Sequence, residues 1–224
     1  MEMKINFATY FDSNYYSKFY NLYNSLLKNC PNFHLYCLVL DKFKIDDKII
    51  ISPNVTILTL EELERSFPEL YYAKKNRSLV EYYFTLTPFI LRYIFKKNKL
   101  EQLSYIDSDL FFFNNPQKIY EVYKKKNYNI LLTEHNNNKI QNKYGKYNVG
   151  WIEFRNSYDT KKCLYEWSQD CINWCYDEVS LDKFADQKYL DKWQKNYNKV
   201  FVVKDFLVNI GPWNFYTLDS KNIN

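Results

Sequence analysis

Glycine is scarce in this sequence, with only three occurrences at Gly145, Gly150 and Gly211. The GxGxxG loop of dinucleotide-binding proteins and the P-loop both use clustered glycines to bring the backbone close to phosphate groups. Neither loop can be formed in the first half of this chain. Any nucleotide must therefore be bound in another way.

Cysteine and histidine are too few and too scattered for a metal centre of nitrogen and sulfur ligands. The five cysteines show no CxxC spacing, and only His34 and His135 could join them as ligands. An odd number of cysteines without paired spacing is typical of reduced, buried thiols. We therefore expect an intracellular protein.

Long apolar runs are absent as well. No apolar stretch approaches the ~20 residues that span a bilayer, and no apolar signal core follows Met1. We predict a cytoplasmic protein without a transmembrane segment, and peripheral contact with a membrane surface is left open. The 31 Lys and Arg are spread along the chain and offset by 26 Asp and Glu, so the net charge of +5 indicates ordinary solvation and no nucleic-acid partner.

The pattern of elements predicts an α/β fold with a mostly parallel central sheet flanked by helices, because strands and helices alternate. At 224 residues and 46% hydrophobic composition, the chain can bury one sizeable core. The predicted strands are 5–11, 34–40, 55–60, a strand ending at Asp107, 130–134, 147–154 and 200–204. The predicted helices start near residue 12, after residue 60, and cover 76–95 with a kink at Pro88, 117–125 and 163–175.

An aspartate–x–aspartate pair, Asp107 and Asp109, follows one of these strands and is the most informative motif. If the pair continues the strand, both carboxylates point to one face, where they repel unless a cation lies between them. Hard oxygen ligands suit Mg²⁺ or Mn²⁺, and two carboxylates leave coordination positions free for phosphates. Ligands of open α/β sheets bind at this edge. The alternative is that the pair merely ends a strand at a turn.

A series of short segments in order along the chain resembles nucleotide-sugar glycosyltransferases of the GT-A fold, close to the family 8-like, glycogenin-related group. The resemblance implies a single Rossmann-like GT-A domain over residues 1–224, with a nucleotide-binding half at 1–113 and an acceptor-side half at 114–224. The matching segments are Phe7–Asp12, Lys75–Ser78, Thr85–Pro88, Tyr105–Asp109, Leu132–His135, Tyr147–Gly150, Phe184–Leu190 and Gly211–Asn214.

This resemblance implies metal-dependent transfer of a sugar from a nucleotide-diphosphate sugar, with UDP as the favoured carrier, to a glycan or lipid-linked acceptor. The process would be glycan or surface polysaccharide synthesis. The alternative is a catalytically silent nucleotide-sugar- or glycan-binding protein on the same scaffold. A sugar-1-phosphate nucleotidyltransferase is set aside, because it needs a glycine-rich loop near the N-terminus.

Carried over residue by residue, the resemblance implies that Asp107 and Asp109 hold the metal. It also implies a set of nucleotide- and donor-binding residues, in which Arg77 has an ion pair with Glu81 as an equal alternative. The implied donor-binding residues are Ala8, Thr9, Tyr10, Asp12, Arg77, Asp107, Ser108, Asn148 and Gly150.

Asp186 and Gln187 resemble the Asp-Gln pair that these enzymes place beneath the anomeric carbon. The resemblance implies that Asp186 holds sugar hydroxyls and that Gln187 offers a weakly basic amide oxygen to an oxocarbenium-like transition state, which favours retention of configuration. An exposed helix start is the structural alternative. On the acceptor side we name His135, for which no role at all is an equal alternative, and Trp213, which we expect to be partly exposed near the aspartates.

Relatives in this group usually continue past the Pro-Trp-Asn segment and supply a C-terminal histidine as a further metal ligand. This sequence ends at Asn224 and has no histidine beyond His135. The resemblance therefore implies either that the chain is truncated or that water and phosphate complete the metal shell.

Overall fold

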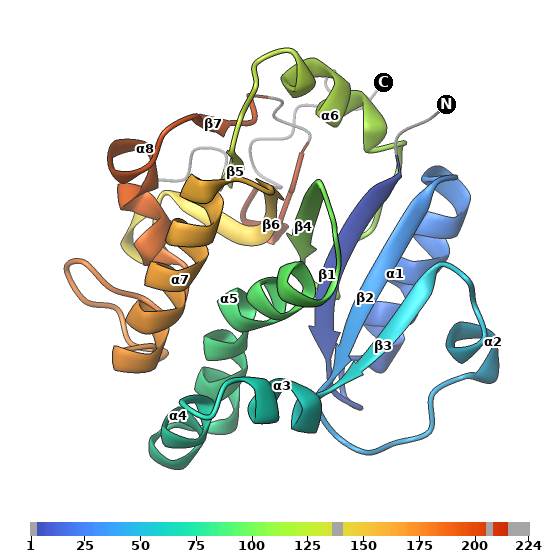
Figure 1. The fold of residues 1–224 in the computed structure, drawn as a ribbon, viewed down its shortest axis with the longest axis horizontal. Helices are drawn as coiled ribbons and strands as arrows, with labels where there is room; N and C mark the ends of the chain where they lie inside the picture. The colour runs from blue at the N-terminus through green and yellow to red at the C-terminus, as the bar shows by residue number, and fades with distance from the viewer. Residues whose placement is uncertain (1–3, 136–140, 205–207, 215–224) are drawn as a thin grey trace.

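The computed structural model describes residues 4–135, 141–204 and 208–214. A seven-stranded sheet with the order β3-β2-β1-β4-β6-β5-β7 forms its centre (Figure 1). β6 is antiparallel to its neighbours β4 and β5, whereas the remaining pairs are parallel, so the predicted mostly parallel sheet is confirmed. The strands are β1 (Ile5–Phe11), β2 (Phe33–Val39), β3 (Val55–Thr59), β4 (Gln102–Ile106), β5 (Ile130–Glu134), β6 (Tyr147–Arg155) and β7 (Val200–Val202).

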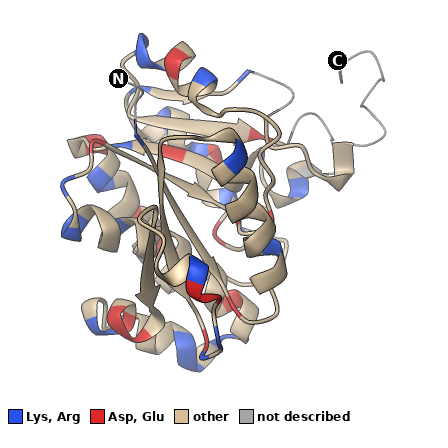
Figure 2. Ribbon diagram, turned by 90° about the vertical axis from the view of Figure 1, so that its right-hand side faces the viewer, with Lys and Arg blue, Asp and Glu red and all other residues tan. Residues whose placement is uncertain are grey.

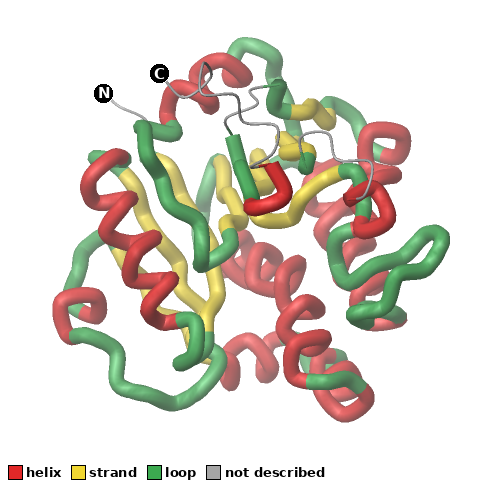
Figure 3. Tube along the Cα trace, turned by 180° about the vertical axis from the view of Figure 1, so that it is seen from behind, coloured by secondary structure: helices red, strands yellow, loops and turns green. Residues whose placement is uncertain are grey.

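Helices cover both faces of the sheet and bury a separate core on each. One face is covered by α1 (Tyr16–Asn29), α2 (Asp47–Ile50) and α6 (Gln117–Lys124). The other is covered by α3 (Leu60–Ser66), α4 (Leu70–Asn76), α5 (Leu79–Lys97), α7 (Tyr158–Asn173) and α8 (Trp193–Asn196). Three short 3₁₀ helices, η1 (Gln141–Tyr144), η2 (Lys188–Lys192) and η3 (Pro212–Asn214), belong to the connections (Figure 3).

Strand β1 shows why the sheet is buried on both sides. Phe7 and Phe11 belong to the core beneath α1, where Phe11 stacks on Phe19 at 3.9 Å between ring centroids. Ala8 and Tyr10 alternate with them and belong to the core beneath α5. A strand covered on both faces reads as a continuous apolar run, which is typical of parallel sheets.

The helix predicted at 76–95 begins later, at Leu79, because the chain is extended at Arg77. A capping box starts α5: the Ser78 side chain accepts from the backbone N–H of Glu81, and the Glu81 carboxylate accepts from the N–H of Ser78. The helix continues through Pro88. This proline has no N–H for the carbonyl of Phe84, and the Thr87 hydroxyl donates to that carbonyl instead, at 3.2 Å.

The start of one further helix differs from the expectation. Helix α7 begins at Tyr158, five residues before the predicted start, because Ser157 caps it by accepting from the N–H of Thr160. Lys and Arg alternate with Asp and Glu over the ribbon, as Figure 2 shows, in agreement with the spread of charge in the sequence. Among the described residues no helix is long and apolar enough to cross a bilayer.

Candidate functional site

Acidic residues follow three parallel strands at one edge of the sheet. Asp12 follows β1, Asp41 follows β2 and Asp107 follows β4, and these strands pair in parallel register. Asp12 accepts from the N–H of Tyr15 at 3.0 Å, and Asp41 accepts from both the N–H and the hydroxyl of Ser13. Asp12 and Asp41 therefore shape turns, whereas Asp107 faces a pocket.

The aspartate pair itself lies in a turn and not in a strand. Strand β4 ends at Ile106, and the N–H of Leu110 donates to the carbonyl of Asp107 at 3.2 Å. The expectation that a continued strand aligns the carboxylates was wrong, but the turn achieves the same result, since Asp107 and Asp109 line one pocket with a volume of about 540 Å³. Ser108 between them is buried, and Asp109 lies 3.7 Å from the ammonium group of Lys18.

The electrostatics of Asp107 favour a cation. Burial and the charge of Asp109 together raise the pKa of its carboxyl group to about 6, against a hydrogen bond that the Tyr105 hydroxyl donates at 3.0 Å. A positive ion between the two carboxylates would relieve both effects.

Gly150 leaves a space in which side-chain oxygen atoms gather beside Asp107. A Cβ at this position would lie 2.8 Å from Oδ1 of Asn148, 3.0 Å from Oδ2 of Asp107 and 3.3 Å from Oδ1 of Asn209. The backbone is in contact as well, because the carbonyl of Gly150 accepts from the N–H of Asp107 at 3.0 Å. Glycine is needed here for space.

This oxygen cradle fits a hard divalent cation such as Mg²⁺ or Mn²⁺. Asp107 and Asp109 supply charge, and the amide oxygen of Asn209 is turned toward them while its Nδ2 donates to the Thr133 hydroxyl at 3.0 Å. Among the described residues, no group of three His, Cys, Asp or Glu side chains is placed to hold a metal. Amide oxygens and ligand phosphates would therefore complete the coordination.

Asp186 is buried behind this pocket, with 5% of its surface exposed. The alternative of an exposed helix start is thus wrong. Burial raises the pKa of Asp186 to about 7, opposed by a hydrogen bond with the Thr87 side chain and assisted by the charge of Asp107. Tyr10 faces the same group, since burial and the charges of Asp186 and Asp107 raise its pKa.

The backbone that presents Asp186 is unusual, because the preceding Ala185 has a positive φ of 45°. Non-glycine residues in this region are strained and are kept where the surroundings hold them. Here the N–H of Ala185 donates to the carbonyl of Tyr176 at 3.0 Å, and the indole N–H of Trp167 donates to the carbonyl of Asp186 at 2.8 Å.

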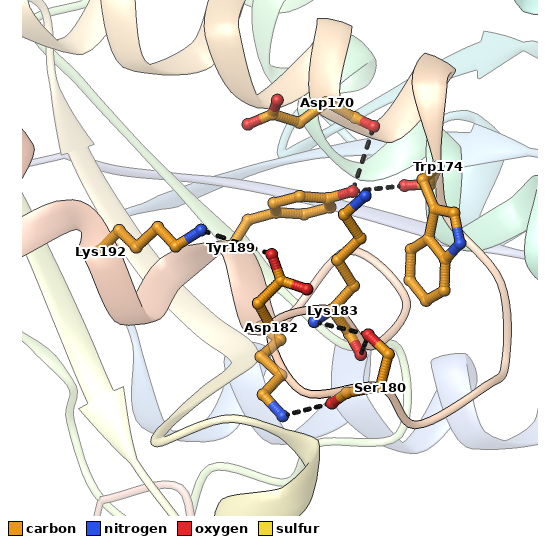
Figure 4. A network of polar contacts seen from close by, with 8 residues as sticks. Asp170, Trp174, Ser180, Asp182, Lys183, Tyr189 and Lys192 are labelled. Atoms are coloured by element: carbon orange, nitrogen blue, oxygen red, sulfur yellow. Dashed lines mark hydrogen bonds and ion pairs between the residues drawn. The ribbon is translucent and has the colours of Figure 1, made fainter.

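The irregular segment between α7 and η2 is anchored at several points (Figure 4). The Tyr189 hydroxyl reaches back to the end of α7 and donates to the carbonyl of Trp174 at 2.7 Å. Ser180 and Lys183 close a turn through reciprocal hydrogen bonds of 3.0 Å, and Lys192 lies 3.9 Å from Asp182. These contacts hold the segment that delivers Asp186 and Gln187.

Gln187 lines the pocket and joins three elements. Its Oε1 accepts from the N–H of Val149 in β6 at 3.2 Å, and its Nε2 donates to the carbonyl of Tyr144 in η1 at 3.0 Å. Both ends of the amide are therefore engaged, which fixes its orientation, and one lone pair of Oε1 remains available.

His135 and Trp213 lie together and line the same pocket. The indole N–H of Trp213 donates to the carbonyl of His135 at 3.2 Å, and their rings meet edge to face at 5.4 Å. Trp213 is partly buried and shares the pocket with Asp109, which confirms its predicted position, whereas Trp151 is buried in the core. Burial lowers the pKa of His135.

The remaining donor-side residues lie outside this pocket. Ala8 and Thr9 are fully buried in β1, and the Thr9 hydroxyl has no hydrogen-bond partner. Arg77 donates to the Thr85 hydroxyl at 2.6 Å and to the carbonyl of Ile172 at 2.5 Å. The alternative of an Arg77–Glu81 ion pair is therefore wrong, because the guanidinium joins α5 to the end of α7. Contact of Ala8, Thr9, Tyr10, Asp12 or Arg77 with a donor stays a prediction.

Three residues of the site were missed by sequence reasoning. Thr87 and Tyr105 stood inside quoted segments, where each reads as part of an apolar helix or strand. Asn209 stands two residues before Gly211, and its positive φ of 59° is a conformation that asparagine tolerates better than most residues. A polar residue two positions before a glycine-proline turn was the available signal.

Comparison with solved structures defines the class of fold. Mouse xyloside xylosyltransferase 1 superposes with a TM-score of 0.57 at 14% identity, covering 91% of this chain and 86% of that one. The galactosyltransferase LgtC, solved with donor and acceptor sugar analogues, gives 0.55 at 14% identity, covering 88% and 73%. GlyE of Streptococcus pneumoniae TIGR4 gives 0.55 at 14% identity, covering 91% and 46%. The fold is thus the GT-A fold of glycosyltransferases.

The particular family follows from sequence relatives. The chain belongs to the family of the uncharacterized protein YfnD of Bacillus subtilis (strain 168), to which it is 32% identical over 97% of its length and 72% of that protein. The uncharacterized protein YfnF of the same strain is 28% identical over 80% of this chain and 61% of that protein. No family model matches the chain.

Proposed function

We propose that the protein transfers a sugar from a nucleotide-diphosphate sugar to a hydroxyl acceptor in a metal-dependent reaction, with retention of configuration. The observation that carries this proposal is that Asp107, Asp109, Asn209 and Gln187 line one pocket, with Asp186 buried close enough to Asp107 to feel its charge. The pocket opens at the carboxyl edge of a GT-A sheet, the edge at which ligands of open α/β sheets bind.

Asp107 and Asp109 would hold Mn²⁺ or Mg²⁺, with the amide oxygen of Asn209 as a neutral third ligand. When bound, such an ion neutralises the negative charge that develops on a departing diphosphate. The half-exposed Lys18 beside Asp109 is a second positive group for the diphosphate. Gly150 leaves room for both the metal ion and the diphosphate, because any larger residue would fill the cradle.

Asp186 and Gln187 would act on the donor sugar. With a pKa of about 7, the Asp186 carboxyl group is partly protonated at neutral pH and can both donate to and accept from sugar hydroxyls. Gln187 is held by two hydrogen bonds and can direct its remaining Oε1 lone pair toward a carbon that gains positive charge. This weak base on the sugar face supports retention.

The acceptor would enter between Trp213, His135 and Phe184. Sugars bind such walls by apolar contact of their C–H groups with rings and by hydrogen bonds to amides. A glycan or lipid-linked acceptor, with UDP as the nucleotide, and a role in polysaccharide synthesis complete the proposal.

A catalytically silent nucleotide-sugar- or glycan-binding protein is the second candidate. The engagement of both ends of the Gln187 amide favours it, because a side chain tied to Val149 and Tyr144 already has a structural role.

One experiment separates the two candidates. A panel of nucleotide sugars is titrated with and without Mn²⁺, and each is scored for binding by calorimetry and for donor hydrolysis by nucleotide release. Metal-dependent binding with hydrolysis of one donor is the expected result. Binding without turnover, with or without acceptor sugars, favours the silent protein, and absence of any metal-dependent binding contradicts the metal-dependent transferase.

A further inference from the structure

A second cavity, of about 400 Å³, lies at the opposite edge of the sheet from the pocket of Asp107. The cavity is lined at the amino ends of β1 and β4 by Lys4, Asn6 and Gln102, and from α6 by Lys124. Helix α6 lies near the N-terminal end of the chain in Figure 1. Because β1 and β4 run parallel, their first residues lie at the edge away from Asp107. The proposed function makes no use of this cavity.

The rim of this cavity carries an excess of positive charge. Lys4, Lys99, Lys124 and Arg155 line it together with one carboxylate, that of Glu101. Over the described ranges, none of these four cations lies within ion-pair distance of a carboxylate. Unpaired cations around a concave surface attract anions, because the low-dielectric walls concentrate the field.

The walls behind the rim are polar and leave hydrogen-bonding groups unused. Gln102 is buried, with 6% of the residue exposed. Its Nε2 donates to the carbonyl of Lys4 at 3.2 Å, while its Oε1 has no hydrogen-bond partner. His34 uses Nε2 toward the Thr56 hydroxyl at 2.8 Å and leaves Nδ1 unpaired. Both of these unpaired atoms are closed to solvent, so they make the wall polar without contacting a ligand directly.

Aromatic rings complete the walls. Tyr36 meets the ring of His34 edge to face at 4.7 Å, and the guanidinium of Arg155 lies 5.3 Å from the centre of the Tyr128 ring. Burial and the charge of Lys4 lower the pKa of His34, which keeps its ring neutral at pH 7. Rings beside amides and cations are the surroundings that phosphorylated sugars need.

We propose that this cavity is a binding site for a phosphorylated saccharide, with the four rim cations around the phosphate and with the rings of Tyr36 and Tyr128 beside the sugar. Its volume lies at the lower end of the range for ligand pockets and suits one or two sugar units. A free sugar phosphate and a phosphodiester-linked oligosaccharide share this chemistry. The site does not depend on the proposed function.

The test uses the whole chain in EDTA, so that the metal-dependent pocket at Asp107 stays silent. Amide chemical shifts are followed by NMR during titration with glucose 1-phosphate, inorganic phosphate and glucose. Saturable shifts are expected around Lys4, Gln102 and Lys124, with glucose 1-phosphate binding at least about fivefold more tightly than phosphate, as one satisfied hydrogen bond provides. Shifts confined to the Asp107 pocket, or equal affinities for both phosphates, would overturn the proposal.

A matched pair of variants tests the role of the rim. Lys124→Glu changes a residue that lines the cavity. Lys125→Glu makes the same charge change at the next residue of the same helix end, which does not line the cavity. Lys124→Glu is expected to weaken glucose 1-phosphate about tenfold and Lys125→Glu to leave it unchanged. Equal effects would show a general charge effect and no site. A phosphodiester-linked disaccharide that binds more tightly than glucose 1-phosphate identifies the polymer as the source, and a weaker one identifies the free sugar phosphate.

Discussion

At the scale of single residues, the candidate active site depends on Asp109. Asp107 is partly buried and has a raised pKa of about 6, so it holds a cation poorly unless a second carboxylate shares the charge. Asp109→Ala is therefore expected to abolish the Mn²⁺-dependent part of donor affinity. Calorimetric titration of UDP with Mn²⁺ and with EDTA measures this, and the exposed Asp47→Ala is the control. Equal affinity in Mn²⁺ and in EDTA for the unaltered protein would refute a metal-dependent site.

Gly150 allows a second test at this scale. Gly150→Ala places a methyl group 3.0 Å from Oδ2 of Asp107 and 3.3 Å from Oδ1 of Asn209. Mn²⁺ affinity, measured by electron paramagnetic resonance, is expected to fall at least tenfold, and the free energy of unfolding by about 1–3 kcal/mol through overpacking. An alanine variant that binds Mn²⁺ as tightly as the unaltered protein would exclude the cradle as the metal position.

At the scale of elements, Gln187 joins η2 to β6 and η1. Its two hydrogen bonds contribute about 1 kcal/mol each, so Gln187→Ala is expected to lower Tm by roughly 4–8 °C and turnover at least tenfold. Gln187→Glu keeps an acceptor for the N–H of Val149 but loses the donor to Tyr144, and is expected to recover part of the stability. Thermal denaturation and turnover per folded molecule are measured together, and a loss of Tm with full turnover would leave Gln187 a structural role alone.

Arg77, like Gln187, stabilises the fold by joining separate elements. Its guanidinium joins α5 to the carbonyl of Ile172 at the end of α7. Arg77→Ala is expected to cost about 1–3 kcal/mol of unfolding free energy, because a charge-assisted hydrogen bond is lost. Since its partners are neutral groups, the loss should be similar in 0.1 M and 1 M NaCl. Chemical denaturation at both salt concentrations checks this, and a loss confined to low salt would restore the ion pair with Glu81.

At the scale of the whole molecule, Glu153 sets a pH dependence. This carboxyl group lies in β6 with hydrogen bonds from Ser104 and Tyr128, and burial raises its pKa to about 8. The folded pKa exceeds the unfolded value of about 4.3, so the stabilisation is complete below pH ~4 and is lost as pH rises through 8, by about 1.4 kcal/mol per unit.

Glu153→Gln removes this contribution and should reduce the slope of the stability curve between pH 5 and 8, while the raised pKa values of Asp107 and Asp186 keep part of the slope. Denaturant unfolding at pH 5, 6.5 and 8 measures it, with the exposed Glu121→Gln as control. If both variants keep the slope of the unaltered protein, Glu153 titrates normally in the folded state.

The sequence by itself determined the sheet and the edge at which the site forms. Alternating strands and helices require parallel pairing, parallel pairing brings strand ends to one edge, and Asp107 follows a strand, so its position there was predictable. Runs of apolar residues encode local burial, which is why β1 and β5 were predicted with their correct bounds.

Only the tertiary structure decided which residues meet at that edge. Asp186, Gln187 and Asn209 stand 79 to 102 residues beyond Asp107 in the sequence. They reach it through irregular segments that carry no periodic pattern. The burial of Asp186, the partners of Arg77 and the place of Asn209 depend on how those segments pack against α5 and α7. Long-range contacts of this kind are settled by packing and hydrogen bonding over the whole fold, which the local order of residues does not encode.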